Sequence, residues 1–265
     1  MQKIAGLHSI QAIFLLRKLV QDVSLKIMPD KFTDKIVLIT GAGRGIGKAC
    51  VQAFLREGAM VLGCSLSQKN LDSLSEELAQ YQDKLYLLAV DLSKSTEIDR
   101  LFEFVNSHTD HLDSVVNAAG VHIASLIADL NEADYDQVLN VNLKAPVLIC
   151  RNAVPYLDKS ASATIVNVSS LSGCFGVQKF PAFGSYDISK YGLWGLTEIL
   201  AIELREKNIR VNQVSPSGVD TEMFYKAVPP GVEPLLSPQQ VARTIMYLAG
   251  EDSAPLSGEN IRLFG

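Results

Sequence analysis

Cysteine and histidine are scarce in this sequence, and neither is grouped as in a metal site. The 265 residues include four cysteines and four histidines. Cys50, Cys64, Cys150 and Cys174 show no metal-ligand spacing, and most of them lie in apolar runs, as buried thiols do. The histidines form no ligand pair. We therefore expect no metal centre and a reduced, cytoplasmic compartment.

An excess of positive charge is also lacking. The formal net charge is −5 and the sequence pI is about 5.4. A chain without a basic stripe has little to neutralise phosphates, which argues against nucleic acid as a partner. No linker, repeat or low-complexity stretch divides the chain, so its length predicts one domain with a large core.

Long hydrophobic runs are missing too. The longest run near the N-terminus, at 10–16, is too short to span a bilayer, and no small-residue cleavage site follows it. We interpret residues 1–32 as an amphipathic extension outside a catalytic domain at 33–265. For residues 1–27 an organelle-targeting peptide, a surface or membrane-interface helix, and translated sequence ahead of a start at Met28 all stay open.

Short apolar runs alternate with helical patterns through the rest of the chain, which is typical of a parallel sheet with helices on both faces. The fold class is therefore α/β, a Rossmann-type doubly wound parallel sheet. The predicted strands are 35–40, 59–64, 85–90, 114–116, 163–168, 209–214 and 260–263. The predicted helices are 48–57, 66–81, 96–107, 131–157, a helix from about 186 to 207, and 238–249.

Polar or glycine-rich clusters follow most of these strands. They are 41–47, Asp91, 117–120, 169–170 and 215–221. Ligands of open α/β sheets bind outside the carboxyl ends of the strands, so these clusters predict one shared site. Packing alone does not explain such convergence.

Two of the motifs carry chemistry. The turn from Thr40 to Gly47 joins a strand to a helix, and its glycines let the backbone approach a pyrophosphate at a helix N-terminus. Tyr186 and Lys190 stand four residues apart, on one face of a helix. A positive charge beside a phenol lowers its pKa and allows it to exchange a proton with a carbonyl or alcohol oxygen.

Taken together, Thr40-Gly-Ala-Gly-Arg-Gly-Ile-Gly47, Asn117-Ala-Ala-Gly120, Ser170, Tyr186-x-x-x-Lys190 and the 216–221 segment resemble the short-chain dehydrogenases/reductases in both content and order. The resemblance covers about residues 33 to 263. It implies an NAD(P)(H)-dependent oxidoreductase that interconverts a carbonyl and a secondary alcohol, and it implies a homodimer or homotetramer.

The resemblance also implies roles for individual residues. Tyr186 is the general acid/base, Lys190 lowers its pKa and bonds the nicotinamide ribose, Ser170 orients the substrate carbonyl, and Asn142 holds a proton-relay water. The implied cofactor-binding residues are Gly41, Arg44, Gly45, Ile46, Gly47, Ser65, Asp91, Leu92, Asn117, Gly120, Tyr186, Lys190, Val219 and Thr221.

Some alternatives stay open from the sequence. Asn140 competes with Asn142, and Ser169 competes with Ser170. His122 faces either substrate or solvent, and Glu222, like its neighbour Asp220, is interpreted as a loop carboxylate. Sixteen positions separate Ser170 from Tyr186, more than is usual in the family, so we expect a remodelled substrate wall between 174 and 184.

The residues after the second strand bear on the choice of cofactor. A carboxylate there would bond the ribose of NAD, but the segment 64–68 contains no acid. The arginine common in NADP-dependent members is missing as well, and Leu66 stands in its place. Arg44, with Ser65 and Ser67, could hold a 2′-phosphate. We therefore favour NADP(H) over NAD(H).

The lid region, 221–236, is short and mixed in character, which fits a small or medium substrate with some apolar surface. The rival hypothesis is a catalytically idle member that senses nucleotide or acts as a scaffold. The complete Asn-Ser-Tyr-Lys set argues against it.

Overall fold

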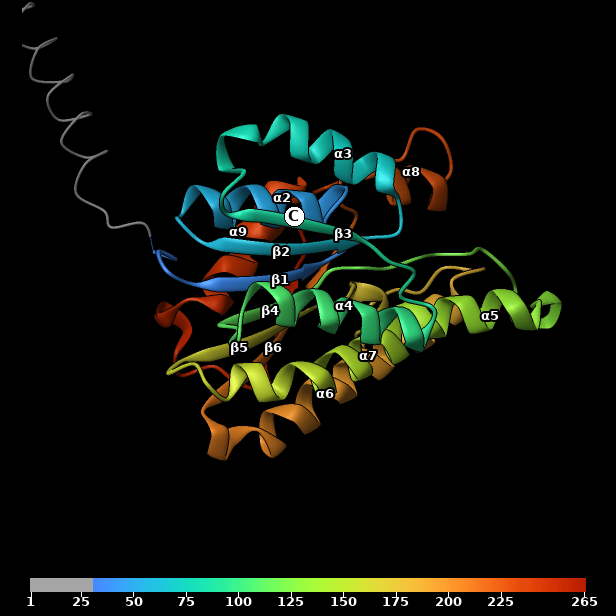
Figure 1. Ribbon diagram of the computed structural model, residues 1–265. Coiled ribbons are helices and arrows are strands. Elements are labelled where there is room, and N and C mark those ends of the chain that lie inside the picture. Colours follow the sequence, from blue (N-terminus) through green and yellow to red (C-terminus); the bar gives the residue numbers. More distant parts are fainter. Residues whose placement is uncertain (1–30) are drawn as a thin grey trace, which may run out of the picture.

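The computed structural model describes residues 31–265, so the predictions for residues 1–27 lie outside the described part of the chain. One seven-stranded sheet runs through the centre, with helices on both sides (Figure 1). Every strand pair is parallel, and the order is β3-β2-β1-β4-β5-β6-β7. The predicted fold class is confirmed. Strand order reverses between β1 and β4, which is where ligands bind in such sheets.

The strands lie within two residues of their predicted bounds because buried β-branched runs mark them clearly. They are β1 Ile36–Thr40, β2 Met60–Ser65, β3 Leu85–Ala89, β4 Ser114–Asn117, β5 Ala163–Val168, β6 Ile209–Pro216 and β7 Asn260–Leu263. The register pairs Thr40 at the end of β1 with Asn117 at the end of β4, so the two loops that follow leave the sheet side by side.

The helices follow the predicted order, with shorter pieces at their ends. They are α2 Gly45–Arg56, α3 Gln68–Glu77, α4 Ser95–His108, α5 Glu132–Leu139, α6 Ala145–Leu157, α7 Gly184–Glu203, α8 Glu222–Ala227 and α9 Pro238–Ala249. Short 3-10 turns include Ala79–Tyr81, Leu171–Gly173 and Arg205–Lys207. The lid helix α8 was not predicted, because six residues are too few to show a periodic apolar pattern.

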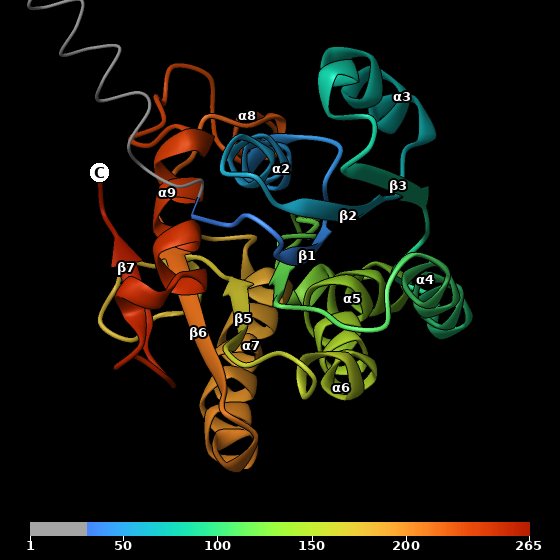
Figure 2. The same ribbon diagram turned by 60° about the vertical axis from the view of Figure 1, so that its left-hand side comes forward.

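Two separate cores cover the two faces of the sheet. In Figure 2, α2 and α9 lie on one side and α4, α6 and α7 on the other. The first core centres on Phe54 of α2 with α9 packed against it, and the second on Leu101 of α4 and Ile149 of α6. Because both faces are covered, the strands are apolar on both sides rather than alternating.

The predicted single helix at 131–157 is interrupted. A π-helical turn, Asn140–Lys144, separates α5 from α6, and the Ala145 N–H donates to the Asn140 carbonyl instead of the usual i−4 partner. Such π turns often occur at functional sites. This one places Asn142 inward, with no exposed surface.

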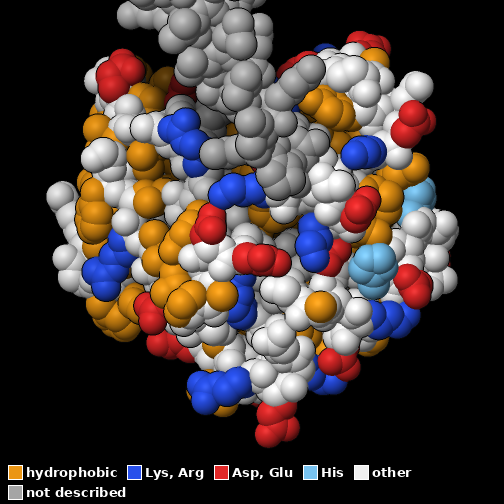
Figure 3. Space-filling model, turned by 90° about the vertical axis from the view of Figure 1, so that its left-hand side faces the viewer, with side chains coloured by type: hydrophobic (Ala, Val, Ile, Leu, Met, Phe, Trp, Pro, Cys, Tyr) orange, Lys and Arg blue, Asp and Glu red, His pale blue; other side chains and the backbone are white. Residues whose placement is uncertain are grey.

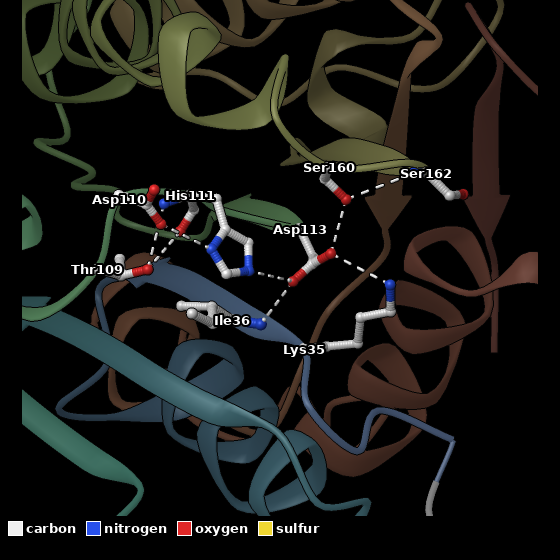
Figure 4. A network of polar contacts seen from close by, with 8 residues as sticks. All are labelled: Lys35, Ile36, Thr109, Asp110, His111, Asp113, Ser160 and Ser162. Carbon is white, nitrogen blue, oxygen red and sulfur yellow. Dashed lines mark hydrogen bonds and ion pairs between the residues drawn. The ribbon is translucent and has the colours of Figure 1, made fainter.

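A polar network ties the N-terminal edge of the sheet together (Figure 4). The buried Asp113 carboxylate accepts hydrogen bonds from the Ile36 N–H at 2.9 Å, Ser160 Oγ at 2.7 Å and Lys35 Nζ at 3.2 Å. His111 Nε2 lies 3.8 Å from the same carboxylate. This network is on the edge opposite the carboxyl ends of the strands, so it belongs to the scaffold rather than to the predicted site.

Acidic and basic side chains are interspersed over the face of the molecule shown in Figure 3. Within residues 31–265, every helix is too short or too polar to cross a lipid bilayer.

Candidate active site

A cleft of about 240 Å³ lies along the carboxyl edge of the sheet, between the loops that follow β1, β2, β3 and β4 and the lid helix α8. The residues predicted to bind the cofactor supply much of its lining, namely Gly41, Arg44, Gly45, Ile46, Gly47, Ser65, Asp91, Leu92, Gly120 and Thr221. Val90, Val121, Gln137, Val141, Glu222 and Met223 line it too, although they were not predicted to. Of these, Gln137 and Val141 had a usable signal, since they lie one helical turn apart just before Asn142.

The glycine turn is built so that only glycine fits at two of its positions. Gly41 has φ +69°, and a Cβ there would lie 2.9 Å from the backbone of Ala119. A Cβ on Gly47 would lie 2.1 Å from the Gly41 carbonyl oxygen. The turn therefore packs tightly against the loop after β4 and against the start of α2. The first residues of α2, Gly45, Ile46 and Gly47, line the cleft, and the first N–H groups of a helix have no partner within that helix, so this end of α2 can bind a phosphate.

Gly120 opens the inner end of the cleft. A Cβ built on Gly120 would point among Asn142 Oδ1 at 3.6 Å, Lys190 Nζ at 3.7 Å and Met223 Cε at 3.9 Å. The missing side chain thus leaves a cradle that connects the nucleotide cleft to the predicted catalytic groups. The residues present fit a nicotinamide nucleotide: the glycine turn would hold its phosphates, and Gly120 would leave room beside Lys190.

Tyr186 and Lys190 lie on adjacent turns of α7, as predicted. Lys190 is buried, and its Nζ donates to the Val168 carbonyl at 2.9 Å. The same nitrogen lies 5.5 Å from the centre of the Tyr186 ring. Figure 1 shows α7 packed along the sheet, and the amino end of this helix carries both residues to the carboxyl edge.

The protein environment favours the neutral form of each group. Burial raises the pKa of Tyr186 to about 12, while a hydrogen bond from Ser170 acts in the opposite direction. Burial lowers the pKa of Lys190 to about 8. Lys190 directs its ammonium to Val168 and does not contribute to the shift at Tyr186, so its predicted lowering of the Tyr186 pKa stays a prediction. With this pKa the tyrosine is a phenol at neutral pH.

The two adjacent serines after β5 have different partners. Ser169 is buried and donates to the Lys190 carbonyl at 3.3 Å, so it fastens α7 to the sheet. Ser170 accepts from the Ser172 N–H at 3.1 Å, and its side chain is near enough to Tyr186 to lower the pKa of the phenol. Only Ser170 therefore contacts the tyrosine. Its action on a substrate carbonyl stays a prediction.

Asn142 clamps the loop after β4 to helix α7. Its Oδ1 accepts from the Val121 N–H at 2.8 Å, and its Nδ2 donates to the Val121 carbonyl at 2.9 Å and to Ser189 Oγ at 3.1 Å. Both amide hydrogens are used, so the side chain retains only one free lone pair. The predicted proton-relay water would have to use that lone pair or the main chain. Asn140 makes no such contact within the described residues.

Four of the predicted cofactor residues are outside the cleft lining: Tyr186 and Lys190 at its inner end, and Asn117 and Val219. The Asn117 amide donates to Asn167 Oδ1 at 2.9 Å, within a buried ladder that continues to Thr197. Its own Oδ1 is buried with no partner in the described structure. Val219 is buried and pairs with Leu236 at the base of the lid. Asn117 and Val219 are therefore buried residues that support the cleft without lining it.

Arg44, predicted to hold a phosphate, is engaged across the mouth of the cleft. Its Nη1 donates to the carboxylate of Glu222, the first residue of α8. Leu66 lines the cleft with 69% of its surface exposed. Asp91 accepts from Ser93 Oγ at 2.6 Å and pairs with Lys94 at 3.2 Å, and these contacts hold the pKa of Asp91 below its ordinary value.

His122 lies beside Tyr186 rather than in open solvent. Its ring is 4.3 Å from Phe183 and 5.4 Å from Tyr186, measured between ring centres. Burial lowers the pKa of His122, which keeps the ring neutral at pH 7. Phe183 comes from the segment 174–184, whose expected remodelling as a substrate wall stays a prediction. Lys179 fixes that segment by donating to the carbonyls of Ser172 and Cys174.

A parallel sheet with a nucleotide cleft at its switch point and a Ser-Tyr-Lys cluster at the inner end defines a nicotinamide-dependent oxidoreductase. The family described as short chain dehydrogenase matches residues 35–230 of this sequence. The chain belongs to the short-chain dehydrogenase/reductase family and is an NAD(P)-dependent oxidoreductase.

Similar proteins cover nearly the whole chain. A 3-oxoacyl-[acyl-carrier-protein] reductase, FabG, of Thermotoga maritima is 36% identical over 240 residues, which is 87% of this chain and 96% of that protein. A hydroxynaphthalene reductase-like protein of Metarhizium robertsii is 31% identical over 260 residues, which is 89% of this chain and 96% of that protein. A crystal structure described as a Shigella flexneri short chain dehydrogenase complexed with NADP has a TM-score of 0.81 and 26% identity, covering 89% of this chain and 99% of that chain.

Proposed function

We propose that this protein is an NADP(H)-preferring reductase that converts a ketone to a secondary alcohol, with Tyr186 as the general acid. The observation that carries the proposal is the position of a protonated Tyr186 beside Ser170 and Lys190, at the end of a cleft with a nucleotide-binding turn. The bound nicotinamide would supply the hydride.

Tyr186 would give its phenolic proton to the substrate oxygen as negative charge develops there. A pKa of about 12 favours the protonated form at neutral pH, as an acid that acts during reduction requires. The Ser170 hydroxyl would donate a second hydrogen bond to the same oxygen and stabilise the oxyanion. In the reverse reaction the phenolate form of the same residue would take up the proton as general base.

Lys190 and Asn142 would act indirectly, through Tyr186 and through the loop after β4. With a cofactor bound, the Lys190 ammonium would shift from the Val168 carbonyl toward a ribose hydroxyl. Its positive charge would then stabilise the phenolate that Tyr186 becomes when it has donated its proton. Asn142 keeps the loop after β4 in register with α7, and so maintains the distance between Gly120 and Lys190.

The preference for NADP(H) rests on charge. No carboxylate follows β2 to repel a 2′-phosphate, and Arg44 lies at the mouth of the cleft. The NADP complex of the Shigella flexneri relative supports the same choice.

For the substrate we propose a ketone with planar or apolar surface next to the carbonyl. His122, Phe183 and Phe180 form an aromatic cluster beside Tyr186, which would give the substrate an apolar wall. The names of the relatives point to two probes of this kind, an acetoacetyl thioester and a bicyclic aromatic ketone.

A homodimer or homotetramer is proposed from apolar surface on two helices. Val147 of α6 and Ile188, Ile199 and Ile202 of α7 are each at least 40% exposed, on the helices that the sequence indicated as an interface. Exposed aliphatic side chains along neighbouring helices are typical of an interface core. The four cysteines are free thiols, which fits the proposed cytoplasmic location.

Fluorescence titration with NADPH and NADH, followed by NADPH oxidation with the two ketone probes, tests this function. We expect saturable binding of both nucleotides, tighter for NADPH, and oxidation that depends on the ketone. A folded protein that binds neither nucleotide would contradict the proposal.

A further inference from the structure

Two charged side chains from opposite walls of the nucleotide cleft meet at its mouth. Arg44 comes from the turn after β1, and Glu222 begins the lid helix α8. The Arg44 guanidinium donates to the Glu222 carboxylate, although the two residues are separated by 178 positions in the sequence. Both side chains are about half exposed, at 54% and 52%. Their ion pair therefore bridges a solvent-accessible cleft rather than stabilising a core.

The charges of the cleft lining suggest that the Arg44–Glu222 ion pair affects the binding of an anion. Among the residues that line it, Arg44 is the only cation and Asp91 and Glu222 are the anions. Asp91 is already satisfied by Ser93 and Lys94. A phosphate entering the mouth of the cleft thus finds a single lining cation, and that cation is held by a carboxylate from the lid.

We propose that Glu222 is a cofactor-specificity residue, because its carboxylate competes with the 2′-phosphate of NADP(H) for the Arg44 guanidinium and so limits the preference for NADP(H) over NAD(H). The proposal rests on the proposed function in taking Arg44 as the partner of that phosphate. It adds a second residue, on the lid, that sets the strength of the preference.

The competition follows from the charges. A 2′-phosphate carries nearly two negative charges, so a carboxylate bonded to the same guanidinium repels it. NAD(H) has a hydroxyl in that position and is not repelled. Leu66, which occupies the place of a second phosphate-binding arginine, has no charge to offset the repulsion.

Glu222 also has a second partner to accept it once Arg44 is released. Lys226, one turn along α8, donates to the other carboxylate oxygen, Oε1. Hydrogen bonds from Lys226 and from Arg44 hold the pKa of Glu222 below its ordinary value, so the carboxylate is charged throughout the working range. Arg44 can thus move from carboxylate to phosphate without leaving Glu222 unpaired.

The test is a set of fluorescence titrations with NADPH and NADH at about 20 mM and about 500 mM salt. Glu222→Gln keeps the size of the side chain and removes its charge. We expect it to lower the Kd for NADPH about three- to tenfold at low salt and to leave the Kd for NADH within about twofold. The difference should shrink at high salt, because screening weakens exposed charges. Glu233→Gln, in the lid but outside the cleft lining, is the matched control and should change neither Kd.

The Arg44→Gln background completes a double-mutant cycle. There Glu222→Gln should no longer improve NADPH binding, because the contested cation is gone. An equal change in both Kd values, or an effect that persists without Arg44, would mean that Glu222 acts through lid structure and would overturn the proposal. No change in either Kd would overturn it too. A wild-type protein that prefers NADH would contradict the proposed cofactor, yet a shift toward NADPH in Glu222→Gln would still support the competition.

Discussion

Replacing Asn142 by aspartate should destabilise the fold far more than the same change at Asn140, two positions earlier. The two substitutions are chemically identical and nearly isosteric. Asn142 is fully buried and uses both amide hydrogens, whereas no hydrogen bond from the Asn140 side chain occurs in the described structure. The comparison therefore isolates the clamp between the loop after β4 and helix α7.

The expected magnitude follows from the partners. An aspartate at 142 would still accept from the Val121 N–H, but its second oxygen would face the Val121 carbonyl and Ser189 Oγ. Ser189 already donates to the Tyr186 carbonyl at 2.7 Å, so it has no hydrogen to offer. The carboxyl would have to take up a proton, which costs about 4 kcal/mol at pH 7 for a group with an ordinary pKa of about 3.9. We expect a loss of about 3–5 kcal/mol in unfolding free energy.

Urea denaturation followed by circular dichroism measures this loss. Since the folded state of Asn142→Asp binds a proton that the unfolded state releases above about pH 4, its deficit should shrink by about 2–3 kcal/mol on going from pH 7 to pH 5. Asn140→Asp should lose less than about 1 kcal/mol at either pH. Equal losses in the two variants, or a deficit that does not depend on pH, would refute the clamp.

Three further predictions concern the scaffold, the buried lysine and the cleft. Asp113→Ala removes the acceptor of the network in Figure 4, and we expect its unfolding free energy to fall by about 2–3 kcal/mol in urea denaturation. The control Asp252→Ala, whose ion pair with Lys31 is exposed, should lose less than about 0.5 kcal/mol. Similar losses in the two variants would contradict a structural role for the network. Lys190 has a folded pKa of about 8, below its unfolded value, so the unfolded state binds more protons above pH 8 and stability should rise with pH from about 8 to 10. In thermal melts the Tm of the Lys190→Met variant should lack this rise. If the Tm of wild type and of the variant changed with pH in the same way, the lowered pKa of Lys190 would be contradicted. Gly120→Val should fold with an unchanged Tm and should weaken NADPH binding at least about tenfold, because its branched side chain would fill the cradle beside Asn142 and Met223. Unchanged NADPH binding would mean that the nucleotide lies elsewhere.

Much of the fold could be predicted because the apolar runs are distinct. Strands such as Ala163–Val168 are continuous β-branched or apolar stretches, and helix Pro238–Ala249 begins with a Ser-Pro capping sequence. The π turn at Asn140–Lys144 could not be predicted in this way. The dihedral angles of its flanking residues are helical, and the hydrogen bond from Asn142 to Val121 that accompanies it is a tertiary contact.

The predicted site residues were brought together where backbone geometry decides their position. Gly41, Gly47 and Gly120 follow strand ends, and the sheet places those ends side by side. Side-chain partners across the cleft were beyond sequence reasoning. The pairing of Arg44 with Glu222, the hydrogen bond from Lys190 to Val168 and the inward turn of Asn117 each depend on segments that are distant in the sequence.

The central claim is that Tyr186 transfers the proton in carbonyl reduction, and the Tyr186→Phe variant tests it most directly. The variant keeps the ring and its contacts with His122 and Phe183 but lacks the hydroxyl. We expect it to bind NADPH with a Kd within about twofold of wild type, and to oxidise NADPH at least about 100-fold more slowly with any ketone that the wild-type protein reduces. A variant that binds NADPH normally and retains more than about a tenth of the wild-type rate would contradict the assignment.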